Sequence, residues 1–453
     1  MGIFNPCWWP LQTLPHYTFW KEGTQCRNHK KQYEGDQVWD DFFHSVSSLK
    51  TKAHQNILSS DSFKADDEEY KIILRICWAG VKLPRISLEE DRKILNSIRP
   101  SVSDYTSITT LHYQNTSFGC LEHLQYLING IVDELDNLAI DDLKVTSACI
   151  LYKSHGKDKS LAESYRKISS WPYLSKCIDS YISELYGHVW EQQQAGTKFK
   201  GRGSSHDLAA LLLTEAIQHS LRSGKTIFVL YLDAKSAFDM VIRQFLENKL
   251  YHCGINDKGF LVIDKQLKHR KTFCEWNGIF VGPIHNKWGL EQGGKNSSEF
   301  YKVFKNSQLE TAQERALGID LGGTDNLTVS TIGQADDVAL VLNDISSLKN
   351  LLNLSLKYCR HPHVQLRANN TKIQAYTAKS SDIQWYYVKV VKPIIIDDQV
   401  IYFSDEAEYV GLVWSTQGIL PHISARIISH RKSLASVLLL VLQDLTSVIQ
   451  QHL

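Results

Sequence analysis

The sequence lacks an excess of either charge. Its 50 Lys and Arg residues are balanced by 49 Asp and Glu residues, which gives a formal net charge of +1. A protein that binds nucleic acid through its overall charge is strongly basic. Any binding of nucleic acid must therefore depend on local basic patches.

Long hydrophobic runs are also missing. The longest apolar stretch, near residues 434–442, is far shorter than the roughly 20 residues that span a bilayer. The start Met1-Gly2 resembles a myristoylation signal, but Pro6 stands where that signal needs Ser or Thr. No charged segment followed by an apolar core, as in a secretory signal, is present. We expect no membrane association.

The cysteines form no pattern that predicts disulfides or zinc. Their number, nine, is odd, and Cys-x-x-Cys does not occur. This favours a reducing, intracellular compartment, with the cytoplasm and the nucleus both open. Cys359, His361 and His363 are ligand-type residues close together, but no second cluster supplies the remaining ligands of a closed zinc site.

The chain has enough hydrophobic sequence for a large core. With 453 residues, 43% of them hydrophobic, it should form two or three subdomains. We treat residues 1–38 as a poorly defined leader. In residues 39–144 apolar side chains recur every three or four positions, for example in 70–78 and 121–132, which predicts a mainly helical region. No catalytic motif occurs there, and no endonuclease is recognisable.

Helices and strands alternate from about Thr146 onward. Ser204-Ser205 can cap a helix that Gly224 ends. The apolar run Ile227–Leu232 predicts a buried strand, and Asn277-Gly278 signals a hairpin turn. Further elements are expected as helices at about 241–251, after Asn296 and at about 346–358, and as a strand-turn-strand around 333–342. This order predicts an α+β domain whose small antiparallel sheet is covered by helices.

Three carboxylates form the strongest candidate site. Asp233 ends the apolar run Ile227–Leu232, and Asp336-Asp337 lies in a Gly-Gln-Ala-Asp-Asp turn between two further apolar runs. Adjacent carboxylates repel each other unless a cation lies between or beside them. Two divalent ions about 4 Å apart, held by carboxylates, catalyse phosphoryl transfer. The residues favour nucleotidyl transfer, although an isolated Ala-Asp-Asp is more often a structural turn.

Three motifs in order make the chain resemble the reverse transcriptases, most closely those of non-LTR (LINE-type) retrotransposons. The segment Asp233-Ala-Lys-Ser-Ala-Phe-Asp239 is similar to motif A, Gly289-Leu-Glu-Gln-Gly-Gly294 to motif B, and Ala335-Asp336-Asp337 to motif C. The resemblance covers roughly residues 145–430. It implies a right-hand polymerase fold, with fingers and palm in residues 145–415. Because the chain ends at Leu453, residues 416–453 are expected to form only a partial helical thumb.

The same resemblance implies an RNA-directed DNA polymerase, which joins a dNTP to a DNA primer on an RNA template. It implies that Asp233, Asp336 and Asp337 hold two Mg²⁺ ions, for which Mn²⁺ can substitute. Lys372, in Asn370-Thr371-Lys372, is similar to the lysine of motif D, which can protonate the leaving pyrophosphate. An ordinary surface lysine is the alternative. Protein partners are unknown.

Nucleotide-binding residues follow from the same motifs. Phe238 matches the aromatic residue that crowds out a 2′-hydroxyl, which is the favoured interpretation, and a plain core residue is the alternative. Gln292 could bond near the template base, and Gly293 allows backbone to approach a base pair closely. Arg166, in Tyr165-Arg-Lys-Ile-Ser169, suits the grip on a triphosphate. A basic residue upstream joins it, and the choice between Lys157 and Lys159 stays open.

Nucleic-acid contacts are expected at two further segments. Lys200 and Arg202, just before the helix that precedes motif A, are placed to contact template phosphate, which positions the strand without reading its sequence. Tyr409 and Gly411 resemble the turn that grips the primer end. Two departures from the family are Gln334, where an aromatic residue usually stands, and the second glycine and Lys295 of motif B.

A second hypothesis is a truncated or non-catalytic retroelement remnant that binds RNA without polymerising. The near-neutral charge, the unrecognised endonuclease and the expected short thumb favour it, whereas the intact carboxylate set disfavours it. Another palm-type polymerase, such as an intron-encoded maturase or a telomerase-like enzyme, is a third option.

Overall fold

The computed structural model describes most of the chain between residues 58 and 416. The described residues are 58, 60–98, 108–133, 143–153, 158, 164–192, 206–234, 237–276, 279–286, 288–315, 318–322, 328–334, 336–360, 366, 370–377, 394–396 and 399–416. Two compact units are present, one made of residues 1–56 and 152–165 and the other of residues 57–151 and 166–453. The described part of the first unit is short, and in it the backbone N–H of Lys153 donates to the carbonyl of Ser164 at 2.8 Å. All elements of the candidate site belong to the second unit.

The described part of the N-terminal region is helical, as predicted. Its helices are α2 (Asp61–Trp78), α3 (Leu88–Ser97), α4 (Thr110–Gln114) and α5 (Phe118–Asp133). Ser60 caps α2 by accepting from the backbone N–H of Phe63, and Ser87 and Glu90 form a capping box at the start of α3. The expected leader lies outside the described residues.

A mixed sheet follows, in the strand order β2-β1-β4-β5. Its strands are β1 (Val145–Tyr152), β2 (Tyr165–Ser170), β4 (Arg270–Trp276) and β5 (Ile279–Asn286). Strands β1 and β4 run parallel, and β4 and β5 form the predicted hairpin, with Trp276 opposite Ile279. Helices α6 (Tyr173–Gln192), α8 (Arg243–His252) and α9 (Lys258–Leu267) share one hydrophobic core with the N-terminal helices.

The second sheet is antiparallel and carries the candidate site. Its strand order is β10-β3-β9-β8, from β3 (Ile227–Leu232), β8 (Thr331–Gln334), β9 (Asp337–Leu342) and β10 (Lys372–Tyr376). Every residue of β3 is buried, which confirms the buried strand predicted from its apolar run. In the register, Leu232 lies opposite Val338, Gln334 opposite Asp337 and Lys372 opposite Tyr231.

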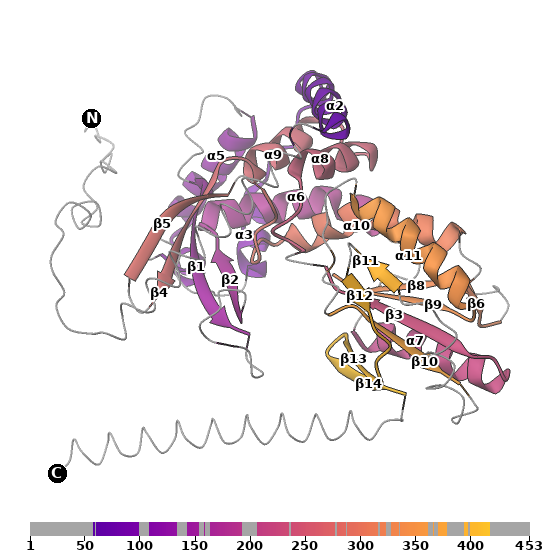
Figure 1. Ribbon diagram of the computed structural model, residues 1–453. Coiled ribbons are helices and arrows are strands. Elements are labelled where there is room, and N and C mark those ends of the chain that lie inside the picture. The colour runs from indigo at the N-terminus through magenta and orange to yellow at the C-terminus, as the bar shows by residue number, and fades with distance from the viewer. Residues whose placement is uncertain are drawn as a thin grey trace, which may run out of the picture. The chain divides into compact units, whose positions relative to one another are not determined.

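Each face of this antiparallel sheet packs on its own core (Figure 1). On one face, alternate residues such as Leu230 and Leu340 pack against α10 (Ser297–Arg315) and α11 (Ile345–Arg360). On the other face, residues such as Val229 and Val341 pack against α7 (His206–Arg222) and the hairpin of β13 (Glu406–Tyr409) and β14 (Leu412–Ser415). This alternation is what a sheet covered on both sides requires. The predicted α+β architecture with an antiparallel sheet is thus present.

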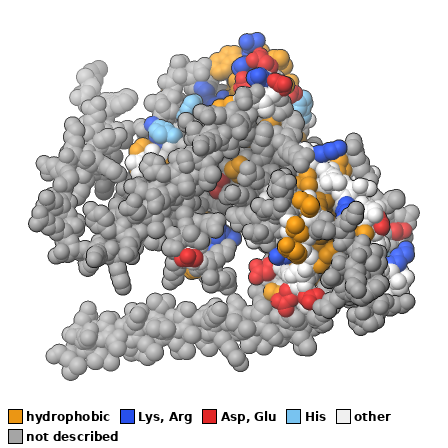
Figure 2. Space-filling model, in the orientation of Figure 1, with side chains coloured by type: hydrophobic (Ala, Val, Ile, Leu, Met, Phe, Trp, Pro, Cys, Tyr) orange, Lys and Arg blue, Asp and Glu red, His pale blue; other side chains and the backbone are white. Residues whose placement is uncertain are grey.

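Smaller elements complete the described part of the chain. Short antiparallel pairs are formed by β6 (Ile319–Asp320) with β7 (Thr328–Val329), and by β11 (Ile394–Ile396) with β12 (Gln399–Ile401). Figure 2 shows acidic side chains gathered near β13 and β14, where Asp405, Glu406 and Glu408 are exposed. Among the residues that the structure describes, no helix is both long and apolar enough to cross a membrane. The expected thumb lies beyond the described residues.

Candidate active site

Strand pairing brings Asp233 and the Asp336-Asp337 pair to the same end of the antiparallel sheet. Asp233 comes directly after β3, and Asp337 is the first residue of β9. Because Leu232 lies opposite Val338, continuing the antiparallel register places Asp233 opposite Asp337. Asp336 precedes Asp337 in the turn after β8. The structure therefore places all three predicted carboxylates at the same end of the two central strands of this sheet.

The three carboxylates also interact electrostatically. Burial, and after it the negative charges of Asp336 and Asp233, raise the pKa of Asp337 from its ordinary value of 3.8 to about 6. The backbone N–H of Val410, which donates to the Asp337 carboxylate, and the positive charge of Arg166 act in the opposite direction. The Asp337 carboxyl therefore ionises less readily than an ordinary aspartate, and a nearby cation would favour its ionised form.

The donor set suits a hard divalent cation, because Mg²⁺ prefers carboxylate oxygen ligands and relieves their mutual repulsion. The side chains do not converge on a common coordination point, however. No three His, Cys, Asp or Glu side chains within the described ranges form a group that could hold a metal ion. Asp233 instead accepts a hydrogen bond at its Oδ2 from Nδ2 of Asn370, at 2.6 Å. Asp233, Asp336 and Asp337 fit Mg²⁺ by their chemistry, with one oxygen of Asp233 already hydrogen-bonded to the protein.

The loop Gln292–Gly293 lies against strand β2. The backbone N–H of Ser169 donates to the carbonyl of Gln292 at 2.7 Å. Gly293 has φ +127°, and a Cβ at this position would lie 2.0 Å from the carbonyl oxygen of Ser169. Glycine is needed here because the backbone of Ser169 comes this close. The approach of Gly293 to a base pair stays a prediction.

Phe238, in the segment similar to motif A, contacts both helix α10 and the loop before Gln292. Its ring is half-buried and stacked on Tyr301 of α10, with ring centroids 4.7 Å apart. Its carbonyl accepts the backbone N–H of Leu290 at 2.8 Å, and the N–H of Gly289 donates to the carbonyl of Val241 at 2.8 Å. The segment after Asp233 and the loop before Gln292 are therefore bonded directly to each other.

Of the predicted basic residues, two lie in described segments. Arg166 is exposed on β2 and is among the charges that act on Asp337. Lys372 is the half-buried first residue of β10, beside β3. The remaining predictions at Lys157, Lys200 and Arg202 fall outside the described residues, as do His361, His363 and the side chain of Cys359.

Tyr409 is the last residue of β13, and Gly411 lies in the tight turn between β13 and β14. The side chain of Tyr409 is only 3% exposed, and its hydroxyl donates to the carbonyl of Ile332 at 3.0 Å. Val410 and Gly411 both have positive φ, 50° and 71°, as a two-residue hairpin turn requires. Any contact of this hairpin with a primer would come from the turn backbone, since the Tyr409 ring is in the core.

Sequence reasoning did not assign roles to Asn370 and Val410, which bond to Asp233 and Asp337. The strand pairing identifies Asn370 as a neighbour of Asp233. Lys372 lies opposite Tyr231, and extending this antiparallel register by two residues places Asn370 opposite Asp233. For Val410 the sequence carries no comparable signal, because its contribution is a backbone N–H.

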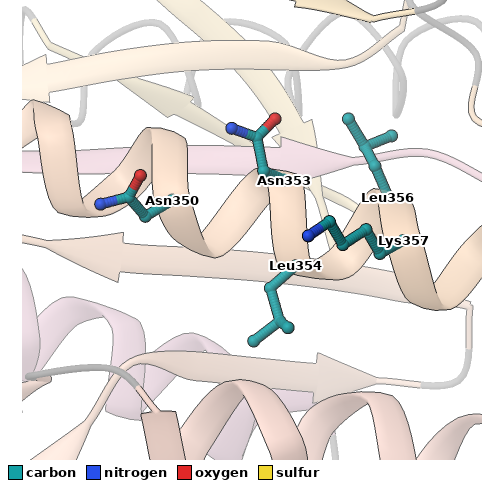
Figure 3. A pocket seen from close by; sticks show the side chains of 5 residues that line it. All are labelled: Asn350, Asn353, Leu354, Leu356 and Lys357. Carbon is teal, nitrogen blue, oxygen red and sulfur yellow. The ribbon is translucent and has the colours of Figure 1, made fainter.

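A surface pocket lies away from these motifs, on helix α11 (Figure 3). All five lining residues come from this helix, and none was predicted as a site residue: Asn350, Asn353, Leu354, Leu356 and Lys357. A concavity along one helix offers no convergent groups for catalysis.

One protein family matches more than half of the chain. The family described as reverse transcriptase (RNA-dependent DNA polymerase) matches residues 154–414. No curated protein matches the chain. Among solved structures, the apo telomerase from Candida tropicalis truncated from its C-terminal domain is similar, with 10% sequence identity and a TM-score of 0.41. That match covers 65% of this chain and 58% of the telomerase chain, so it adds no argument beyond the family match.

Proposed function

The chain belongs to the reverse transcriptase (RNA-dependent DNA polymerase) family, and from this premise we propose that it is the RNA-directed DNA polymerase of a non-LTR retrotransposon. The observation that carries the proposal is the row of carboxylates at the end of the antiparallel sheet, where burial and its two neighbours raise the pKa of Asp337. The order of motifs A, B and C supports the non-LTR assignment. The odd number of cysteines supports an intracellular setting.

In the proposed reaction, a primer 3′-hydroxyl attacks the α-phosphorus of a dNTP. The new phosphodiester bond forms as the bond to the pyrophosphate breaks, and pyrophosphate leaves. When bound, two Mg²⁺ ions held by Asp233, Asp336 and Asp337 would supply charge stabilisation to the attacking and leaving oxygens. Mn²⁺ could take their place.

The chain's own residues bind and orient the reactants in this proposal. Arg166 is exposed near Asp337, so its planar guanidinium can bind the triphosphate. Phe238 forms a wall against the sugar, held in place by its stacking on Tyr301. Lys372, at the start of β10, would donate a proton to the leaving pyrophosphate. RNA template and DNA primer would contact Lys200, Arg202 and the turn at Gly411.

The test is dNTP incorporation on a poly(rA)/oligo(dT) template-primer with Mg²⁺ and with Mn²⁺. We expect Asp336→Ala to lose incorporation by at least about a hundredfold, because a metal ligand contributes several kcal/mol at the transition state. Asp61→Ala serves as the control, since Asp61 is an exposed aspartate in the first turn of α2. Circular dichroism should show that both variants keep the parent's secondary structure.

A folded Asp336→Ala variant that incorporates near the parent rate would contradict the polymerase assignment. The alternative function is a remnant that binds RNA without polymerising. Tight binding of the template-primer by a parent protein that shows no metal-dependent incorporation would select that alternative.

A further inference from the structure

The residue before Gln292 is a buried glutamate bonded to the mixed sheet. Oε1 of Glu291 accepts from Nδ2 of Asn286 on β5, from Oγ1 of Thr272 on β4 at 3.0 Å, and from Oγ1 of Thr146 on β1 at 3.4 Å. Its side chain is only 5% exposed. One carboxylate oxygen thus connects the start of the Gln292–Gly293 loop to three neighbouring strands.

The other oxygen of Glu291 faces a buried arginine. Oε2 lies 3.8 Å from Nη1 of Arg270, whose side chain is 1% exposed. Nη2 of Arg270 donates to Oε1 of Gln266 at 2.7 Å, and its guanidinium lies 3.4 Å from the centre of the Trp171 ring. These two charges partly compensate each other in the buried interior. Asp179 also acts on the charge of Arg270, so neutralising Glu291 leaves Arg270 less well compensated.

The loop is held at its far end by a second acidic residue. Asp179 on α6 accepts from the backbone N–H of Asn296 at 3.2 Å and from the Asn296 side chain at 2.9 Å. Between the two ends, a Cβ on Gly294 would lie 2.7 Å from the Trp171 ring, the same ring that covers Arg270. The loop therefore lies between two buried acidic anchors.

We propose that Glu291, paired with Arg270, is a positioning residue that holds the Gln292–Gly293 loop against the mixed sheet and thereby sets the affinity for the incoming dNTP. This role rests on the proposed function and on the expectation from the sequence that Gln292 lies near the template base. Glu291 itself is buried in the sheet and touches the reactants only through the loop it holds.

The test compares Glu291→Gln with Glu215→Gln, the same chemical change at an exposed position on α7. Glutamine can still accept from Thr272 and Asn286, so the variant mainly removes the charge opposite Arg270. We expect the KM for dNTP to rise about fivefold to tenfold, the effect of weakening a charge-assisted contact, with kcat and the template-primer Kd changed by less than about twofold. Glu215→Gln should match the parent in all three.

A second, milder variant keeps the test usable if Glu291→Gln does not fold. Thr272→Val removes the hydrogen bond from Thr272 to Glu291 without changing any charge. It also removes the bonds of this hydroxyl to Thr146 and Asn286. We expect a KM increase of about twofold to threefold. A merely structural role would reduce the fraction of active protein, measured by active-site titration, and leave the KM of the active fraction unchanged. That outcome in both variants would overturn the proposal.

Hydrogen exchange separates this inference from the polymerase assignment. Peptides covering Ser169 and residues 289–296 should exchange faster in Glu291→Gln than in Glu215→Gln, while peptides from α11 stay unchanged. If the parent does not incorporate dNTP, the proposed function fails, but faster local exchange would still support the anchoring role. Equal exchange in the two variants would overturn the anchoring role, whatever the activity.

Discussion

Removing the charge of Asp91 should stabilise the protein at neutral pH. Asp91 lies in the first turn of α3 with no exposed surface, and within the described residues neither of its carboxylate oxygens has a hydrogen-bond partner. Tyr173 and Cys177 of α6 are close enough to interact with it, and burial raises the pKa of both, so they stay neutral. A helix N-terminus favours an anion by only about 0.3–1 kcal/mol. Burial outweighs this and raises the pKa of Asp91 to about 6.

The size of the effect follows from that pKa. The pKa of Asp91 rises from the ordinary value of 3.8 to about 6, which is roughly two units. Each unit corresponds to about 1.4 kcal/mol, so the ionised carboxylate lowers the stability of the folded state by about 3 kcal/mol. The folded state binds this proton more tightly than the unfolded state. Stability contributed by the protonated form is therefore complete below about pH 4 and is lost as pH rises through about 6. An asparagine does not titrate and avoids the loss.

Urea unfolding of the parent and Asp91→Asn, from pH 4 to pH 7.5, tests this reasoning. The variant should match the parent near pH 4 and exceed it by about 3 kcal/mol above pH 6.5. Asp61→Asn is the matched control, because Asp61 also lies in the first turn of a helix but is fully exposed. It should be slightly less stable than the parent. A variant Asp91→Asn that is no more stable at pH 7, or whose advantage does not depend on pH, would refute the argument.

Three further changes have expected outcomes. Gly293→Ala should lower the free energy of unfolding by about 3 kcal/mol or more, because of strain at φ +127° and the close backbone contact. Gly224→Ala, at φ +67° with open space around it, should cost only about 1 kcal/mol. Equal costs in the two variants would contradict the contact at Gly293. Asn370→Ala should lower the Mg²⁺ concentration needed for half-maximal incorporation by about twofold to tenfold. The reason is that the Asn370 hydrogen bond to Asp233 competes with Mg²⁺ for the same carboxylate oxygen. An unchanged or higher Mg²⁺ requirement would argue against that competition. Phe238→Ala should raise the use of ribonucleotides relative to deoxyribonucleotides by at least about tenfold in competition assays, and an unchanged ratio would favour the plain core residue.

The strand β3 and the helices α7 and α11 were predictable because their sequence signals are local. The run Ile227–Leu232 is apolar throughout and is buried throughout as β3. The helix expected to end at Gly224 is α7, and Gly224 has the positive φ that ends a helix well. Helix α11 likewise covers the segment expected near residues 346–358. Local periodicity determined these elements, and tertiary packing changed only their end points.

The partners of the carboxylates were less predictable because they come from distant parts of the chain. Glu291 reads as one polar residue in a glycine-rich loop, and only the fold shows that it is bonded to three strands. Tyr409 is different, since a signal was available. Exposed and buried residues alternate along β13, so Tyr409 shares the inward face with Ala407. Its burial could have been read from that alternation.

The alternation of the two cores also determines where the carboxylates lie. Val338, Leu340 and Leu342 face α10 and α11, so Asp337 has the same parity as Ala339 and Val341, which face α7 and the β13–β14 hairpin. By the same count Asp233 shares its face with Val229 and Tyr231.

Carrying the register across the sheet gives one row of Asn370, Asp233, Asp337 and Gln334. A slip of one residue in β9 would move Asp337 to the α11 face and put apolar residues on the wrong side. The hydrophobic pattern of β3 and β9 therefore fixes the register, and the register places Asp233 beside Asp337. Burial of the two cores thus positions the candidate catalytic carboxylates, although their charges repel one another.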